Sequence, residues 1–265
     1  MARTALLNVM VQAVLRAGRG LARDFGEVEN LQVSLKGPGN FVSAADRRAE
    51  ETLVAELRKA RPGYSFLTEE SGTIEGADSA NRWIVDPLDG TTNFLHGIPL
   101  FAVSLALERD GVLVAGVIFN PILNELYVAE RGSSAFLNDR RLRVAARRRL
   151  DDAVIATGAP NVGSEGHDEF IDELRLFMAK TAGVRRCGSA ALDLAWVASG
   201  RFDGFWERGL SPWDMAAGIV ILREAGGLVS GPTGNDDMMQ TGAMVAGNET
   251  IHAELVAGLK GLRSG

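Results

Sequence analysis

An apolar run in the first third of the chain ends in two aspartates and a turn, in the stretch Trp-Ile-Val-Asp-Pro-Leu-Asp-Gly-Thr-Thr-Asn-Phe over residues 83–94. Aromatic and β-branched residues favour a covered sheet, so Trp83–Val85 predicts the end of a buried strand. Pro87 lacks a backbone N–H and is expected to stop that strand. The pattern therefore predicts an α/β fold with Asp86 and Asp89 at a strand's carboxyl end, where such folds bind ligands.

The two aspartates and the turn after them indicate metal and phosphate chemistry. Carboxylates held this close repel each other unless a cation lies between them, and hard oxygen ligands favour Mg²⁺ or Mn²⁺. The Gly90–Thr92 turn offers backbone N–H groups that stabilise an anion. Asp-Gly is also an ordinary turn, and an aspartate near a helix start is an ordinary cap. Two aspartates joined by proline and followed by Gly-Thr-Thr favour a ligand site over these structural roles.

Composition argues against several classes of protein. The 265 residues are 46% hydrophobic, enough for a substantial core, and the net charge of −6 gives no basic field for nucleic acid. The single cysteine rules out a disulfide framework, and the three histidines form no zinc-binding pattern. No apolar run is long enough to span a membrane, and the amphipathic start predicts a helix rather than a cleaved signal. These features favour a soluble, cytoplasmic enzyme.

Periodicity divides the chain into two halves without a repeat or linker, so we expect one unit over residues 1–265. Residues up to about 150 predict an antiparallel-rich α+β lobe, with a hairpin at Asp110-Gly111. Residues 151–265 alternate strands and helices, as in an α/β lobe. We expect helices at about 4–24, from 43, at 168–180, 189–199 and 213–225, and a last one to 259, with strands at 64–67, 101–107, 112–119, 125–129, 135–137, 153–157, 183–186, 202–206 and 228–230.

A second acidic cluster has a good structural explanation. Glu207 follows a predicted strand, and the next helix opens at Ser211. Pro212 suits the first helical position, and Asp214 completes a capping box with Ser211. Local sequence therefore favours a cap, and Asp214 becomes part of a site only if it faces the two earlier aspartates in space.

Three further acidic residues give no functional signal by themselves. Glu69 and Glu70 precede a glycine turn, where paired glutamates are usually solvated. Asp46 lies in a predicted helix beside Arg47 and Arg48, so its local pattern is that of a surface charge.

Four segments taken together carry a more specific signal. They are Thr68-Glu69-Glu70-Ser71-Gly72, Asp86-Pro87-Leu88-Asp89-Gly90-Thr91-Thr92-Asn93-Phe94, Gly188-Ser189-Ala190-Ala191 and Pro212-Trp213-Asp214-Met215-Ala216-Ala217-Gly218. In order and approximate spacing they resemble the inositol monophosphatase family, in particular its bacterial SuhB-type members. The resemblance runs from about Lys36 to Asn248 and implies a layered sandwich of alternating helices and sheets.

The resemblance implies a site for two or three Mg²⁺ ions, with Mn²⁺ able to substitute. Glu69 would bind the first ion and help to activate the attacking water, and Asp86 would bridge two ions. The carbonyl of Leu88 would complete the first site, and Asp89 and Asp214 would hold the second ion beside the leaving-group oxygen. Paired ions can stabilise both the attacking and the departing oxygen of a phosphate ester.

The resemblance also implies roles in catalysis and substrate binding. Thr91, hydrogen-bonded to Asp46 in the family pattern, would help to deprotonate the water, and the N–H groups of Gly90 and Thr91 would hold the phosphate. The substrate hydroxyls would be contacted by Gly188, Ser189, Ala190 and Glu207, beside Asp89 and Asp214.

The implied activity is hydrolysis of myo-inositol 1-phosphate by a Mg²⁺-dependent phosphomonoesterase, with a homodimeric state and lithium inhibition as further family expectations. The alternatives within the superfamily are fructose-1,6-bisphosphatase, histidinol-phosphate phosphatase and a nucleotide 3′-phosphatase. Glu207 favours a neutral polyol, because it would repel a second phosphate nearby. Arg208 could offset that repulsion.

A different class of function, interaction with RNA or the transcription machinery, is also raised by the SuhB-type resemblance. Its sequence features are arginine clusters at Arg185-Arg186, Arg140–Arg143 and Arg147–Arg149. Such clusters are more often solvated surface, or salt-bridge partners in an acidic chain.

One position departs from the family pattern. Asn40 stands where the family commonly has an aspartate, which puts in question how the Lys36–Asn40 loop closes and whether a third metal is supported. We expect Asn40→Asp to change the Mg²⁺ dependence modestly, and an identical metal titration would contradict this.

Overall fold

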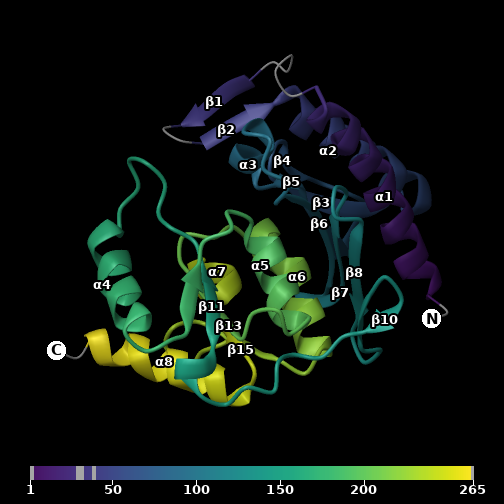
Figure 1. Ribbon diagram of the computed structural model, residues 1–265. Coiled ribbons are helices and arrows are strands. Elements are labelled where there is room, and N and C mark those ends of the chain that lie inside the picture. Colours follow the sequence, from purple (N-terminus) through teal and green to yellow (C-terminus); the bar gives the residue numbers. More distant parts are fainter. Residues whose placement is uncertain (1–2, 28–32, 38–39, 264–265) are drawn as a thin grey trace.

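Helices and sheets alternate in layers across the computed structural model, which describes residues 3–27, 33–37 and 40–263 (Figure 1). The helical layers consist of α1 (Ala5–Phe25), α2 (Ala44–Ala60), α4 (His167–Met178), α5 (Ala190–Ala198), α6 (Pro212–Glu224) and α8 (Glu249–Arg263). The pair α1 and α2 covers the outer face of an eight-stranded sheet, and α5 and α6 lie between it and a five-stranded sheet. The other face of the second sheet is covered by α4 and α8, which completes the layered sandwich predicted from the sequence.

The first sheet is antiparallel except for one pair of strands. Its strands are β3 (Tyr64–Thr68), β4 (Gly72–Ile74), β5 (Asp78–Asp89), β6 (Ala102–Arg109), β7 (Val112–Asn120), β8 (Glu125–Glu130), β9 (Ala135–Leu137) and β10 (Arg140–Arg141). Their order is β10-β9-β8-β7-β6-β5-β3-β4, and only β3 and β5 run parallel. The predicted hairpin between β6 and β7 is confirmed, with φ of 50° at Asp110 and 75° at Gly111. Asp-Gly suits such a tight turn because these residues tolerate positive φ.

The second sheet has the order β12-β11-β13-β15-β14. Its strands are β11 (Val154–Thr157), β12 (Gly183–Arg185), β13 (Gly204–Glu207), β14 (Leu228–Ser230) and β15 (Met244–Gly247). Strand β11 runs parallel to β12 and β13, so the carboxyl ends of β11 and β13 meet at one edge. The short elements outside the two sheets are the strand pair β1 (Val33–Gly37) and β2 (Asn40–Ser43), α3 (Thr91–Leu95), α7 (Met238–Thr241) and a 3₁₀ turn at Leu150–Asp152.

The middle layer forms the centre of the core. Every residue from Met215 to Leu222 in α6 is buried, because this helix has a sheet on each side. Gly116 of β7 allows close approach, since a Cβ there would lie 2.6 Å from the carbonyl oxygen of Ala217. Although α6 is apolar, it has only 13 residues. Among the described residues, no helix combines the length and apolarity needed to cross a membrane.

The prediction that Pro87 ends its strand is wrong. Strand β5 continues to Asp89, and its pairing with β6 shifts between Asp86, opposite Ser104, and Asp89, opposite Ala102. The chain therefore advances three residues on β5 while it advances two on β6, and this extra residue on β5 is a β-bulge. Proline is tolerated in a bulge because no ladder bond is required of it there. The bulge places both aspartates at the end of the strand.

The loop that carries the departure from the family pattern is described only in part. Asn40 begins β2, but residues 38 and 39 and the side chain of Asn40 lie outside the described part of the chain. The expected effect of Asn40 on the loop and on metal dependence therefore stays a prediction.

Candidate metal and phosphate site

Three carboxylates from two distant parts of the sequence lie together between the two sheets. Asp86 and Asp89 stand at the end of β5, and Asp214 stands in the first turn of α6. One oxygen of each lies within 4.8 Å of the others. The condition that the sequence left open is met, because Asp214 faces the two earlier aspartates.

Each aspartate is oriented by hydrogen bonds to one of its oxygens. The Leu88 N–H donates to Asp86 Oδ1 at 2.9 Å, and the Ser211 N–H donates to Asp214 Oδ2 at 2.7 Å. Asp89 Oδ2 accepts from the Ser189 hydroxyl at 2.6 Å and from the Ala191 N–H at 2.7 Å. The predicted capping box at Asp214 is present, so Asp214 both caps α6 and faces the cluster. Capping and ligand binding are compatible, because a carboxylate has two oxygens that each accept more than one contact.

The cluster carries more negative charge than its surroundings compensate. Burial raises the pKa of Asp86 well above its usual value, and the charges of Glu69, Asp89 and Asp214 raise it further. Burial likewise raises the pKa of Asp89 to about 6 and, together with the charge of Asp89, that of Asp214 to about 8. Across the described ranges, none of the three aspartates forms an ion pair with lysine, arginine or histidine. A set of hard oxygen donors that is largely shielded from water and carries uncompensated charge fits a divalent cation.

Glu69 stands beside this cluster on the turn after β3. Its N–H donates to the Val85 carbonyl at 3.2 Å, and its carboxyl group is close enough to Asp86 to raise the pKa of that residue by charge and by hydrogen bonding. The turn is fixed by Glu50, which is 3% exposed and which sequence reasoning missed. Glu50 accepts from the Glu70 N–H at 2.9 Å and from the Ser71 hydroxyl.

Thr91 and Asp46 form a hydrogen-bonded pair next to the aspartates. Thr91 Oγ1 lies 3.0 Å from Asp46 Oδ1 and 3.1 Å from the Leu88 carbonyl oxygen, so its one proton is directed to this side. Asp46 is fully buried, so the local expectation of a surface charge is wrong. Its other oxygen accepts from the N–H and the hydroxyl of Ser43, at 2.8 and 2.5 Å. Burial raises the pKa of Asp46, and the bonds from Ser43 and Thr91 oppose that rise.

The turn at Gly90 requires glycine for two reasons. Its φ is 95°, and a Cβ there would lie 2.9 Å from the Leu100 carbonyl oxygen. Gly90 precedes α3, whose first N–H groups have no carbonyl partner inside the helix. Asn93 then joins this motif to the second half of the chain, because its amide donates to the carbonyls of Leu100 and Cys187, each at 2.7 Å. Sequence reasoning gave Asn93 no role.

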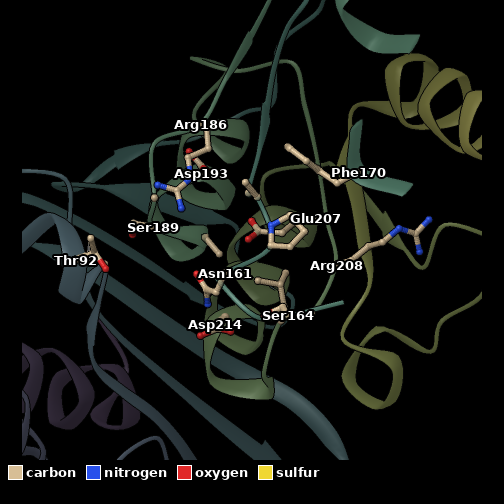
Figure 2. Close-up of a pocket in the computed structure, with 18 of the residues that line it drawn as sticks. Thr92, Asn161, Ser164, Phe170, Arg186, Ser189, Asp193, Glu207, Arg208 and Asp214 are labelled. Atoms are coloured by element: carbon tan, nitrogen blue, oxygen red, sulfur yellow. The ribbon is translucent and has the colours of Figure 1, made fainter. Parts of the chain in front are cut away.

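A cavity of about 300 Å³ opens beside the aspartates. Its lining includes all of the predicted substrate-binding residues: Asp89, Gly90, Thr91, Gly188, Ser189, Ala190, Glu207 and Asp214. Asp193 and Arg186 line the same cavity and were not predicted (Figure 2). Asp193 is 1% exposed, and burial raises its pKa well above the usual value. The Asp193 position carried a visible signal, because it is a charged residue within the apolar sequence of α5.

Glu207 projects into the cavity from the end of β13. Burial raises its pKa well above the usual value, and the charges of Asp193 and Asp214 add to that rise. Gly158, just after β11, leaves room for it, since a Cβ on Gly158 would lie 1.7 Å from Glu207 Oε1. The end of β11 therefore shapes the position of Glu207, a dependence that the sequence did not reveal.

Cys187 is half-buried. Burial, with the neighbouring charge of Asp193, raises the pKa of its thiol to about 12. A thiol with so high a pKa is a poor nucleophile at neutral pH, which agrees with a site built from carboxylates.

The whole chain is similar to known proteins. Residues 2–262 match the model of the inositol monophosphatase family. An inositol-1-monophosphatase from Mesorhizobium japonicum is 66% identical over 98% of each chain, and the Nus factor SuhB of Pseudomonas aeruginosa is 45% identical over 92% of this chain and 91% of its own. The crystal structure of the extragenic suppressor protein suhB from Bartonella henselae has 61% identity and a TM-score of 0.95, covering 97% of this chain and 99% of that one. With the carboxylate cluster and the layered fold, these matches show that the chain belongs to the inositol monophosphatase family.

Proposed function

We propose that this protein is a Mg²⁺-dependent phosphomonoesterase that hydrolyses myo-inositol 1-phosphate. The observation that carries the proposal is the cluster of Asp86, Asp89 and Asp214, of which Asp86 is buried and the other two line a cavity with polar walls. The 66% identical relative is named an inositol-1-monophosphatase, which supports the choice of substrate.

The metal ligands we propose are Glu69, Asp86, Asp89 and Asp214, with the Leu88 carbonyl. Their chemistry fits Mg²⁺, and Mn²⁺ as a substitute, because every donor is a hard oxygen. When bound, two or three such ions would supply Lewis-acid stabilisation of the charge that builds up on the phosphate. The uncompensated charge of the cluster supports this set of ligands.

Thr91 and Asp46 would orient and deprotonate the attacking water. Because the Thr91 hydroxyl directs its proton towards Asp46 and the Leu88 carbonyl, its lone pairs are free to accept a hydrogen bond from water. Buried Asp46 would receive the proton through Thr91. The N–H groups of Gly90 and Thr91 would hold the phosphate oxygens at the start of α3.

The polyol would occupy the part of the cavity around Glu207. Glu207, Ser189 and the backbone of Gly188 and Ala190 offer hydrogen-bond partners on one wall. Hydroxyl groups would pair with the Glu207 carboxylate, whereas an apolar leaving group would leave it without a partner at a cost of about 1–3 kcal/mol. The lining therefore favours a polyol phosphate over an alkyl or aryl phosphate.

The test is phosphate release from a panel of substrates with and without Mg²⁺. The panel contains inositol 1-phosphate, fructose 1,6-bisphosphate, histidinol phosphate and adenosine 3′,5′-bisphosphate, so that it also covers the alternatives within the superfamily. We expect turnover led by inositol 1-phosphate, dependent on Mg²⁺ and abolished by Asp89→Asn. Asp110→Asn, the same change on the exposed β6–β7 turn, should retain full activity. Metal-independent turnover, or none by folded protein, would contradict the proposal.

Three finer expectations belong to the same proposal. Li⁺ should inhibit by competing for one metal position, which a Li⁺ titration at fixed Mg²⁺ would show. The protein should be a homodimer, which sedimentation would measure. Its location should be the cytoplasm, which cell fractionation would test.

A second candidate function is an interaction with the transcription machinery, favoured by the 45% identical relative named Nus factor SuhB. The arginine clusters differ in whether their side chains form ion pairs. Arg147 pairs with Asp203 at 3.1 Å, and Arg149 pairs with Asp151, whereas Arg140 and Arg141 are exposed on edge strand β10.

The structure indicates which arginine variants can test the interaction without affecting catalysis. Arg186 lines the substrate cavity, so Arg185→Ala/Arg186→Ala would disturb both roles. Arg140→Ala/Arg141→Ala leaves the cavity intact and is the cleaner variant. Loss of co-purification with transcription proteins, with phosphatase activity intact, would support the second role, and no interaction by the wild-type protein would contradict it.

A further inference from the structure

The cation next in sequence to Glu207 lines the cavity, but its guanidinium points away from Glu207 and pairs with α4 (Figure 2). Arg208 Nε and Nη2 donate to Glu173 Oε1 at 2.9 and 2.5 Å, and Nη2 lies 3.1 Å from Glu169 Oε1. Both glutamates belong to α4 and stand one helical turn apart, so they face the same side. We name Glu169 and Glu173 the α4 clamp.

Strand geometry explains why the α4 clamp reaches Arg208 and not Glu207. Side chains alternate between the two faces of a strand, so Trp206, and Arg208 directly after the strand, meet Glu173 of α4 while Glu207 lies on the opposite face. Trp206 Nε1 donates to Glu173 Oε2 at 3.1 Å, so both oxygens of Glu173 are engaged. The Glu173 side chain is only 4% exposed. A buried carboxylate with two partners fixes the guanidinium more firmly than a surface pair would.

The consequence is that Arg208, although next to Glu207 in sequence, offers it no free positive charge. The cavity lining includes the acidic groups Glu173, Asp193 and Glu207 and two arginines, Arg186 and Arg208. The guanidinium of Arg208 is already paired with the α4 clamp. Arg186 is exposed at the rim and forms no ion pair with the described residues. A ligand with hydroxyl groups finds acceptors here. A ligand with a second phosphate lacks the guanidinium that Arg208 would supply if it turned inwards.

We propose that the α4 clamp sets the selectivity of this enzyme for monophosphates by holding the guanidinium of Arg208 against α4, so that it is not available to a second phosphate in the cavity. Glu169 and Glu173 are thus positioning residues for specificity, acting through Arg208 and not on the substrate itself. The inference rests on the proposed phosphatase function, whose substrate preference it explains. It also answers the question that the sequence left open, because Arg208 is engaged elsewhere and does not offset Glu207.

The test compares two substrates that differ only in a second phosphate, inositol 1-phosphate and inositol 1,4-bisphosphate. Initial phosphate release gives kcat/KM for each, and the measured quantity is the ratio of bisphosphate to monophosphate. Glu169→Gln/Glu173→Gln keeps the shape of the clamp but removes its charge. We expect the ratio to rise about tenfold, mainly through a lower KM for the bisphosphate, because a freed guanidinium makes charge-assisted hydrogen bonds to phosphate. Adding Arg208→Gln to this variant should return the ratio to the wild-type value.

A role of the clamp confined to docking α4 makes a different prediction. Loss of docking would lower kcat/KM for both substrates together, and Arg208→Gln would not reverse any change in the ratio. An unchanged ratio in active, folded Glu169→Gln/Glu173→Gln would therefore overturn the inference while leaving the phosphatase function standing. If that variant does not fold, Glu173→Gln alone is used as the test. The ratio of bisphosphate to monophosphate kcat/KM should then rise only about threefold, because Glu169 still holds Arg208. Wild-type protein inactive on both substrates would instead contradict the proposed function itself.

Discussion

At the scale of single residues, the pair of Asp46 and Thr91 gives the sharpest test of the proposed water activation. Because the two act as one unit, Asp46→Asn and Thr91→Ala should each lower kcat about 100-fold, with little change in KM. The double variant should be hardly worse than either single variant, since residues of one unit are not additive. Steady-state kinetics with inositol 1-phosphate measures all three. Thr91→Ser, which keeps the hydroxyl, should retain most of the activity, and independent, multiplying losses would argue against a shared role.

Gly158 gives a second prediction at this scale. A Cβ at Gly158 would overlap the Glu207 carboxylate, so Gly158→Ala must displace Glu207 within the cavity. We expect KM for inositol 1-phosphate to rise about tenfold while kcat changes less, because Glu207 is proposed to contact the polyol and not the phosphate. Gly20→Ala on α1 is the matched control, since a Cβ there meets nothing within 4 Å. Equal kinetics for Gly158→Ala and wild type would show that the position of Glu207 does not affect substrate binding.

Asp46 and Glu50 show what local sequence misses at the residue scale. Asp46 was expected to be a surface charge and Glu50 was given no role, yet the two lie four residues apart on the face of α2 that also buries Ala45, Ala49 and Leu53. Placed on a helical wheel, the two acids fall within the apolar stripe, which is a recoverable sign of buried carboxylates with partners. Their partners, Thr91 and the Glu70–Ser71 turn, are set by tertiary contacts that helical periodicity does not contain.

At the scale of elements, the start of α6 combines a helix cap with a proposed metal ligand, and substitution can separate the two. Asparagine at position 214 can still accept from the Ser211 N–H, so Asp214→Asn should keep the stability of the metal-free protein while abolishing Mg²⁺-dependent activity. Asp214→Ala should lose activity and also about 1 kcal/mol of stability through the lost cap. Chemical unfolding in chelator measures the stabilities. A metal-free Asp214→Asn as unstable as Asp214→Ala would show that the cap depends on the charge.

Elements that depend on local turn or cap residues were predictable from the sequence. Elements that depend on a partner strand or helix were less predictable. The Asp110-Gly111 hairpin and the Ser211 cap were predicted because turn and cap chemistry are local. The extension of β5 through Pro87 was missed, since a bulge depends on the partner strand β6. The same bulge brings Asp86 and Asp89 to the strand end, so the error in the strand did not displace the site.

At the scale of the whole molecule, the site exists because two distant parts of the chain meet between the sheets. Asp89 on the first sheet is held by Ser189 and Ala191 at the start of α5, and Asn93 bonds to the Cys187 carbonyl. These contacts join residues about a hundred positions apart. Periodicity and spacing alone could not bring them together, and the resemblance to a family supplied that part of the prediction.

The assembled cluster makes the stability of the whole protein depend on pH and metal in a defined direction. Because burial raises the pKa of Asp89 to about 6 and of Asp214 to about 8, the metal-free folded state binds more protons than the unfolded state between about pH 5 and 8. Stability must then fall as pH rises through this range. We expect the Tm in chelator to drop by several degrees from pH 6 to 8, and Mg²⁺ to restore it more at pH 8, where protons compete less for the carboxylates.

The control is Asp89→Asn/Asp214→Asn, compared with the wild-type protein at each pH. The double variant removes two repelling carboxylates, so in chelator its Tm should exceed that of the wild type at pH 8 and approach it at pH 6, and Mg²⁺ should stabilise it far less. Thermal unfolding at both pH values, with and without Mg²⁺, measures all of these differences. A wild-type protein whose metal-free stability rises with pH relative to the variant would mean that the cluster is compensated by something other than a cation, and the metal site would have to be placed elsewhere.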